Sequence, residues 1–293
     1  MSRCSGDRES MTVISIQSQV AWGHVGNSAA VFPIQAHGID VVAVPTTLLS
    51  NRPGYDTIRG RVLDVQLVAD LLLGIEERGA LDGARMILSG YLGSADIAAE
   101  VADFVSGAKA RNPALLYCCD PVLGDREEGL FVRLDIPPLM RDQLCPLADI
   151  ITPNHFELEY LCGTKATTID AVIAQARTII ARGPSTVVVT SAELPDTSGD
   201  TIETLAIEAT RAWRLRTPRV PISPNGTGDL FAGLFAAARV QGSDTPAALG
   251  HAASAIFAVL ERTARSGTEE MRIVETGEEL VHPKRRFEAV AIT

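Results

Sequence analysis

Short apolar runs alternate with longer amphipathic segments along most of the chain. The apolar runs predict buried strands at residues 13–16, 41–44, 86–88, 115–119, 149–151 and 186–190. Apolar residues recur at helical spacing in residues 29–37, 62–78, 95–111 and 169–182. Strands and helices that alternate in this way predict a mostly parallel sheet with helices on both faces.

In the last third of the chain, predicted strands and helices no longer alternate one by one. Residues 203–207 and 212–217 predict a pair of strands, and residues 228–241 and 246–261 predict two long helices. With no long linker, repeat or low-complexity tract, residues 11–293 are expected to form one three-layer αβα domain. Residues 1–10 are polar and lack the apolar run of a signal peptide, so we expect a disordered leader or tag.

Charge and composition narrow the classes of partner. The net charge is −10 and the basic residues are scattered, which argues against a nucleic-acid partner. No stretch approaches the roughly 18 apolar residues of a membrane span, which argues against a membrane protein. The 5 cysteines are odd in number and lack metal-ligand spacing, which fits a reducing cytoplasm.

The segment that opens the helix predicted at 228–241 carries the sharpest chemical signal. Gly226, Thr227 and Gly228 precede Asp229, which falls in the first helical turn. Glycines and a helix N-terminus present unpaired N–H groups to an anion, as phosphoryl transfer requires. The Asp229 carboxylate could take a proton from a substrate hydroxyl. Helix capping by Thr227 or Asp229 is the alternative interpretation.

Further candidates follow other predicted strands, where ligands of parallel sheets bind. Asp120 and Asp125 flank a turn and suit magnesium, although an Asx-type turn explains them equally well. Asn154 and Glu157 share one face of a helical turn, which fits either a capping interaction or a glutamate directed at hydrated metal. His155 is interpreted as a surface or packing residue rather than a metal ligand, because no partner spacing supports a metal site.

Two weaker signals lie at strand ends. Thr190 and Ser191 end a predicted strand, where their hydroxyls could bind phosphate oxygens or cap the next turn. Ser18 follows the first predicted strand and could hydrogen-bond a heteroatom of a substrate. The glycine-bearing turn after it lacks the spacings of a dinucleotide fingerprint or a Walker loop.

Together these segments resemble the pyridoxal kinases of the ribokinase-like superfamily, from about Val13 to the end of the chain. The resemblance is carried by residues 16–18, 26–30, 50–51, 54–55, 89–91, 119–125, 149–154 and 226–229. The Gly-Thr-Gly-Asp element at 226–229 marks the superfamily. The Gln-Ser pair at 17–18 and the loop around 50–55 are more specific to the vitamin B6 branch.

The resemblance implies a role for each matching residue. Asp229 corresponds to the catalytic base, acting on the substrate's hydroxymethyl group, and Gly226, Thr227 and Gly228 correspond to an anion hole. The implied substrate-binding residues are Ser18, Val25, Pro53, Gly54, Tyr91 and Asp229. The implied residues for ATP are Asp120, Asp125, Thr152, Glu157, Thr190, Ser191, Arg219, Val220, Thr227 and Gly228, with Asp120 and Glu157 near magnesium, largely through water.

The resemblance further implies a homodimer that uses ATP with Mg²⁺, helped by a monovalent cation such as K⁺. The expected reaction is phosphorylation of the 5′-hydroxymethyl group of pyridoxal. Residues 49–55 and 125–129 are expected to act as lids that exclude water. In the first of these, Pro53 stands where relatives often carry threonine, which removes a hydroxyl and a backbone donor.

Two other functions stay open at this point. One is a kinase for another hydroxymethyl heterocycle, such as hydroxymethylpyrimidine, against which Asp229-Leu230 counts modestly. The other is a catalytically silent protein that binds vitamin B6 or a nucleotide. The presence of Asp229 together with its glycines argues against silence.

Overall fold

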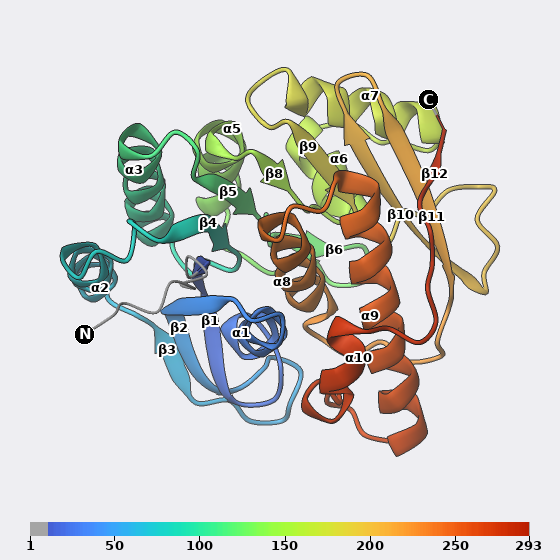
Figure 1. The fold of residues 1–293 in the computed structure, drawn as a ribbon, viewed down its shortest axis with the longest axis horizontal. Coiled ribbons are helices and arrows are strands. Elements are labelled where there is room, and N and C mark those ends of the chain that lie inside the picture. Colours follow the sequence, from blue (N-terminus) through green and yellow to red (C-terminus); the bar gives the residue numbers. More distant parts are fainter. Residues whose placement is uncertain (1–10, 293) are drawn as a thin grey trace, which may run out of the picture.

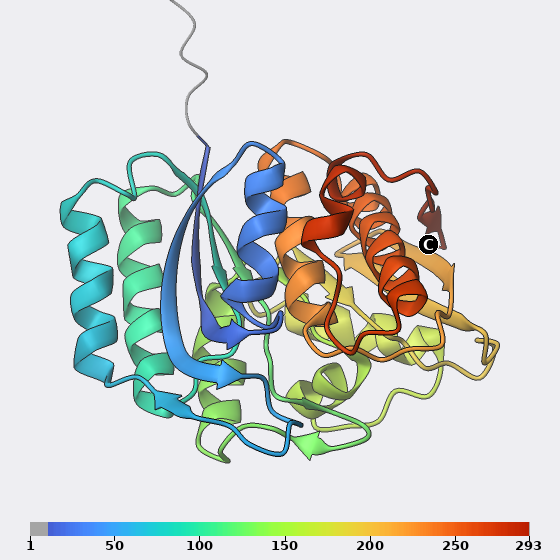
Figure 2. The same cartoon turned by 90° about the horizontal axis from the view of Figure 1, so that it is seen from below.

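The computed structural model describes residues 11–292, in which a twisted sheet separates two groups of helices (Figures 1 and 2). The sheet has 10 strands in the order β12-β11-β10-β9-β8-β5-β4-β1-β2-β3. Its strands are β1 (Thr12–Trp22), β2 (Asp40–Asn51), β3 (Gly60–Val62), β4 (Ala84–Ser89), β5 (Leu116–Cys119), β8 (Ile150–Ile151), β9 (Thr186–Val189), β10 (Thr201–Glu208), β11 (Ala212–Pro218) and β12 (Val290–Ala291). β6 (Gly124–Asp125) and β7 (Gly129–Leu130) form a separate small hairpin.

The centre of the sheet is parallel and its two edges are antiparallel. β2, β1, β4, β5, β8 and β9 run parallel to one another, whereas β3 at one edge and β10, β11 and β12 at the other pair antiparallel. The predicted strand pair near residues 203–217 is therefore confirmed as β10 and β11. The carboxyl ends of the parallel strands share one edge of the sheet, where ligands bind in such folds.

Helices cover both faces of the sheet. One face carries α2 (Val65–Glu77), α3 (Ala95–Arg111), α4 (Ile136–Leu139), a π-helical turn (Met140–Leu144), α5 (Cys145–Leu147), α6 (His155–Cys162) and α7 (Ile169–Ile180). The other carries α1 (Asn27–Ala36), α8 (Thr227–Val240), α9 (Thr245–Ser266) and α10 (Gly277–Val281), with a 3₁₀ turn (Val274–Thr276) before α10. The predicted three-layer αβα arrangement is confirmed.

Successive side chains along a strand point to opposite faces of the sheet, which explains why the protein has a hydrophobic core on each face. Val187 and Val189 of β9 pack in the core under α7, whereas Val188 packs in the core under α8 and α9. All three side chains are fully buried. A strand buried on both faces has no polar side, so it reads in the sequence as an unbroken apolar run.

Most predicted elements match the structure, with shifts at their ends. α3 has the predicted bounds, and Gly38, Gly79 and Gly183 follow helices with positive φ. The helix predicted at 62–78 begins only at Val65, because Gly60–Val62 forms strand β3. The second long C-terminal helix runs on to Ser266, beyond the predicted 261.

The first strand differs from the prediction in a way that affects the site. Gln17 and Ser18 were expected to follow the strand, but β1 continues to Trp22. Pairing of β1 with β4 ends at Ile16, while pairing with β2 continues through a bulge opposite Ser18. β1, β2 and β3 therefore extend beyond the rest of the sheet. Bulges of this kind often aim a side chain into a site.

Residues 1–10, predicted to be a leader or tag, lie outside the described part of the chain. Within residues 11–292, no helix has the length and apolar character needed to cross a membrane.

Candidate active site

The polar residues predicted at strand ends gather along the carboxyl edge of the sheet. Asp120 follows β5, Thr152 follows β8 and Thr190 follows β9. Asp229 faces them from the first turn of α8. Asp120, Glu157 and Asp229 are close enough to influence one another's charge.

The Asp229 carboxylate is the group best placed for proton transfer. It lies deep in the protein, although part of the residue remains accessible to solvent. Burial raises its pKa to about 6, while a hydrogen bond donated by the backbone N–H of Gly26 opposes this shift. A carboxylate with a pKa near neutrality is ionised at pH 7 and still basic enough to accept a proton.

Two glycine turns meet beside this carboxylate. Gly26 has φ +55°, and a Cβ there would lie 2.1 Å from the Ser18 carbonyl oxygen. Gly226 has φ +84°, and a Cβ there would lie 1.9 Å from the His24 carbonyl oxygen. Only glycine fits either position, and the left-handed backbone at Gly226 opens the first turn of α8 toward solvent.

An open cleft adjoins the start of α8. It brings together six of the residues predicted to bind nucleotide, namely Thr190, Ser191, Arg219, Val220, Thr227 and Gly228. Its apolar wall comes from α8 and α9, through Phe231, Ile256 and Phe257. An apolar wall beside a helix N-terminus suits a flat heterocycle attached to a phosphate chain.

Ser191 leaves β9 in a strained conformation at this cleft. Its φ of 49° makes it the one non-glycine residue with positive φ among residues 11–292. His155, predicted to be a surface or packing residue, is buried and supports the loop. Its Nδ1 accepts a hydrogen bond from the Glu193 N–H at 3.0 Å, and its Nε2 lies 2.9 Å from the Ala166 carbonyl oxygen. Burial lowers the pKa of His155, which favours the neutral ring that these contacts need.

Asp120 and Thr152 form a buried pair next to Asp229. The Thr152 hydroxyl donates to Asp120 Oδ1 at 3.0 Å, and each residue is only 4% exposed. Burial, together with the charges of Glu157 and Asp229, raises the pKa of Asp120 well above its usual value. Carboxylates held together without a counter-charge form a site that favours a cation.

Glu157 takes part in capping helix α6, which was one of the two roles that the sequence left open. Its Oε1 accepts from the N–H groups of Leu123 and Gly124, and its Oε2 accepts from the Asn154 N–H. Asn154 Oδ1 in return accepts from the Glu157 N–H, which completes a capping box. Burial nevertheless raises the pKa of Glu157 to about 7. The capping alternative is thus present, and little of the carboxylate is left for a ligand.

Asp125 likewise shapes a turn. Its Oδ1 accepts from the N–H groups of Glu127 and Glu128 in the β6–β7 hairpin. Arg126 ties the hairpin to the body of the protein through ion pairs of 3.3 Å with Glu159 and with Glu193. The Asx-type turn foreseen as an alternative for Asp125 is present.

The predicted substrate residues lie on the other side of Asp229. Ser18 is 7% exposed opposite the bulge of β2, and Thr46 in that bulge donates to the Tyr91 carbonyl oxygen at 2.7 Å. Tyr91 is half-buried, as is Val25 in the turn before α1. Pro53 and Gly54 are exposed in the loop after β2.

The residues present can be tested against a magnesium ion. No group of three or more His, Cys, Asp or Glu side chains within residues 11–292 is arranged to enclose a metal. Asp120 has one carboxylate oxygen hydrogen-bonded to Thr152, and Glu157 has both oxygens occupied. This set fits Mg²⁺ held chiefly by phosphates and water, which is how the ion usually binds at nucleotides.

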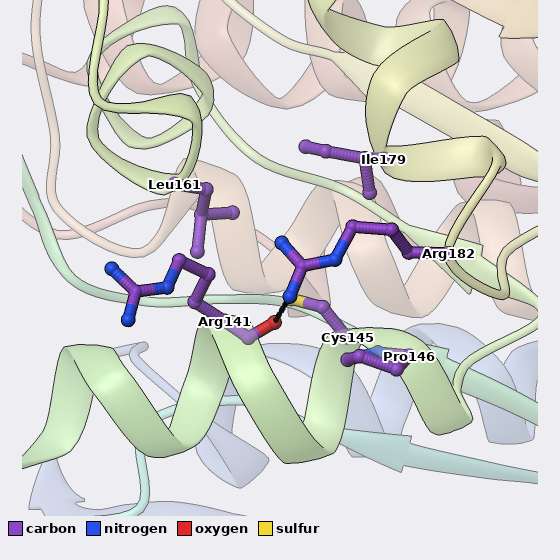
Figure 3. Close-up of a pocket in the computed structure, with 6 residues that line it drawn as sticks. All are labelled: Arg141, Cys145, Pro146, Leu161, Ile179 and Arg182. Carbon is purple, nitrogen blue, oxygen red and sulfur yellow. Dashed lines mark hydrogen bonds between the residues drawn. The ribbon is translucent and has the colours of Figure 1, made fainter.

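A small pocket lies between the helices at the opposite end of the protein (Figure 3). In it, Arg182 Nη2 donates to the Arg141 carbonyl oxygen at 3.2 Å, and the side chain also pairs with Asp142. Arg182 precedes β9, so this pocket lies toward the amino ends of the parallel strands. It is separate from the residues described above.

The sequence did not point to several residues that shape the site. Phe231, Ile256 and Phe257 line the cleft but read as ordinary helix core. Arg52 and Glu270 meet beside the substrate loop, 218 residues apart in the chain. A spacing search cannot find such a pair. The only local hint was the charge of Arg52 next to the predicted loop residues Pro53 and Gly54.

A cleft beside a glycine-bearing helix N-terminus, at the carboxyl edge of a three-layer αβα sheet, is the arrangement expected of a small-molecule kinase of the ribokinase-like fold. A model of the phosphomethylpyrimidine kinase family matches residues 61–273. Pyridoxal kinase PdxY of Leifsonia xyli is 45% identical over 277 residues, covering 94% of this chain and 98% of that protein. Its counterpart in Rubrobacter xylanophilus is also 45% identical, covering 94% and 96%.

Solved structures agree with the sequence relatives. Pyridoxal kinase from Leishmania donovani in complex with ADP and pyridoxamine superposes with a TM-score of 0.88 at 28% identity, covering 96% of this chain and 99% of that chain. The chain belongs to the pyridoxal kinase family.

Proposed function

We propose that this protein transfers the γ-phosphoryl group of ATP to the 5′-hydroxymethyl group of pyridoxal, giving pyridoxal 5′-phosphate. The position of Asp229 carries the proposal, since it directly follows the cleft residues Thr227 and Gly228 and its carboxylate accepts from the N–H of Gly26, which packs against Ser18. The names of the relatives support the choice of pyridoxal.

In the proposed reaction, Asp229 accepts the proton of the substrate hydroxyl as its oxygen attacks the γ-phosphorus. The N–H groups of Gly226, Thr227 and Gly228 stabilise the negative charge that develops on the phosphoryl oxygens. Ser18 and Tyr91 hold the pyridine ring. General-base catalysis contributes on the order of 10²–10⁴-fold, and positioning supplies much of the remainder.

We further propose that ATP is used with Mg²⁺, with Asp120 and Glu157 contributing largely through water. When bound, the ion neutralises phosphate charge. The buried, mutually repelling carboxylates of Asp120, Glu157 and Asp229 support this assignment. A monovalent cation such as K⁺ is expected from the family resemblance. An activity assay with Mg²⁺ removed by EDTA and restored, in sodium or potassium buffer, tests both ions.

A homodimer and a cytoplasmic location complete the proposal. Exposed apolar side chains lie along the projecting strands and the loop beside them, with Trp22, Leu48 and Ile58 at 66%, 48% and 41% exposure. A second copy of the chain would cover them. Light scattering of the wild type and of Leu48→Arg tests the dimer.

The free cysteines Cys118, Cys119, Cys145 and Cys162 support a reducing compartment.

The deciding experiment measures formation of pyridoxal 5′-phosphate by wild type and Asp229→Asn. We expect product from the wild type and a loss of at least about 10²-fold in kcat for the variant, with ADP affinity retained. Equal activity would remove Asp229 from the mechanism. Hydroxymethylpyrimidine is assayed alongside, because the matching family model is named for phosphomethylpyrimidine kinase. Binding of pyridoxal without turnover would indicate a silent binding protein.

A further inference from the structure

We propose that Glu270 is a positioning residue that fixes the substrate loop and joins it to the glycine turn beside Asp229. Glu270 lies in the segment after α9, far from the site in sequence. Its Oε1 accepts from Arg52 Nε at 2.9 Å and from the Tyr55 hydroxyl at 2.7 Å. Its Oε2 accepts from the His24 N–H at 3.2 Å. One carboxylate thus binds three donors from two separate loops.

The charge of Glu270 matters because Arg52 is buried. Arg52 is 8% exposed, and its guanidinium lies over the Tyr55 ring, 4.6 Å from the ring centroid. A buried cation needs a paired anion, and removal of one partner is strongly destabilising. The other acid near Arg52 is Glu269, whose carboxylate lies 3.6 Å away with its side chain 77% exposed. Because the Glu269 carboxylate is exposed to water, its pairing with Arg52 at that distance contributes little.

Glu270 also packs against the turn that supports the glycines near Asp229. A Cβ on Gly23 would lie 2.5 Å from Glu270 Oε2, so the carboxylate fills the space beside that glycine. The following residue, His24, places its carbonyl oxygen against Gly226. Met271 completes the contact, because its Cε lies 3.2 Å from the Cβ position of Gly226. Residues 270 and 271 therefore touch both the substrate loop and the anion-binding glycines.

This arrangement predicts a selective defect when Glu270 is removed. The substrate loop would lose its anchor, and the Arg52 cation would be left unpaired beside the substrate. The nucleotide cleft is lined by β9 to β11, α8 and α9 and contains none of the residues that Glu270 binds. The inference rests on the proposed pyridoxal kinase reaction for its kinetic readout, but the loop contact itself does not depend on that reaction.

The kinetic test compares Glu270→Ala and Glu270→Gln with the neighbouring control Glu269→Ala. For Glu270→Ala we expect the KM for pyridoxal to rise about tenfold or more, as loss of a charged hydrogen bond predicts. The KM for ATP should change much less, by no more than about twofold, because none of the residues that Glu270 binds lines the nucleotide cleft. Glu270→Gln keeps one acceptor oxygen, so its KM for pyridoxal should lie between those of the wild type and Glu270→Ala. Glu269→Ala should have the same KM values as the wild type. Equal rises in both KM values, or an equal effect of Glu269→Ala, would overturn the proposal.

A second measurement separates this proposal from the proposed reaction. Trypsin cleavage after the exposed residue Arg59 reports on the loop without any turnover. We expect Glu270→Ala to be cut several-fold faster there than wild type, with Glu269→Ala unchanged and the melting temperatures recorded in parallel. Faster cleavage in a protein that does not phosphorylate pyridoxal would retain the loop contact and reject the reaction. Unchanged cleavage would reject the loop contact whatever the activity.

Discussion

Gly226 and Gly228 look alike in the sequence, yet the structure predicts different consequences for changing each to alanine. At Gly226 an added Cβ would lie 1.9 Å from the His24 carbonyl oxygen, roughly 1.5 Å closer than van der Waals contact allows. Its φ of +84° adds the left-handed penalty of about 1–2 kcal/mol for a residue with a side chain. At Gly228, inside α8, no protein atom lies within 4 Å of the added Cβ.

These differences set the expected magnitudes. Gly226→Ala must displace either the His24 turn or the start of α8. A displacement of about 1 Å at a catalytic site costs on the order of 10²-fold in rate. Its left-handed strain alone should lower the melting temperature by about 2–8 °C for a domain of this size. Gly228→Ala should keep or slightly raise the melting temperature, since alanine favours helix by about 0.5–1 kcal/mol.

Activity and stability are measured together on both variants by steady-state kinetics and calorimetry. Gly228→Ala should fold normally and still lose activity, because its Cβ would stand where the phosphoryl group passes. A fully active Gly228→Ala would show that the backbone there does not approach the phosphate. A stable and active Gly226→Ala would refute the steric argument itself.

Three further predictions follow from the same geometry. In the proposed reaction Asp229 must be ionised to accept a proton, and its pKa is about 6, so kcat should fall roughly tenfold per pH unit below pH 6. A kcat that stays constant down to pH 5 would exclude Asp229 as the base. His155→Leu removes the acceptor for the Glu193 N–H and should raise the KM for ATP about three- to tenfold without changing the KM for pyridoxal; equal changes would contradict a local role. Ser191→Gly relieves a φ of 49° and should raise the melting temperature by about 2 °C in a thermal scan; a lower melting temperature would show that the loop gains from the serine.

The sequence predicted the parallel centre of the fold well, because strands buried on both faces leave unbroken apolar runs. Val187, Val188 and Val189 illustrate this, with side chains in both cores. The projecting part of β1 was missed for the opposite reason. Beyond Ile16 the strand loses its β4 neighbour, its next three residues are polar and its last two are exposed, so its pattern resembles a loop.

The site was predictable only where its residues follow a strand or open a helix. Asp120, Thr152, Thr190 and Asp229 satisfy that rule, and their positions follow from the topology of a parallel sheet. Glu270 does not, since it is one of two adjacent acids that follow no predicted strand, and its partners lie more than 200 residues away. Choices between capping and ligand roles, as at Glu157, depend on hydrogen-bond geometry that spacing alone cannot supply.

The order of the strands also divides the proposed site into an acceptor half, which would bind the alcohol, and a donor half, which would bind the nucleotide. Each half can change without the other. The proposed acceptor residues come from β1, β2 and the segment after β4, whereas the nucleotide cleft is built from β9, β10, β11 and the C-terminal helices. Only the start of α8 belongs to both. Loops on the acceptor half could therefore be changed, by substitution or in length, without altering the residues that line the donor half. Exchange of residues 49–60 between relatives would be a practical route to redirecting such a kinase toward new alcohols.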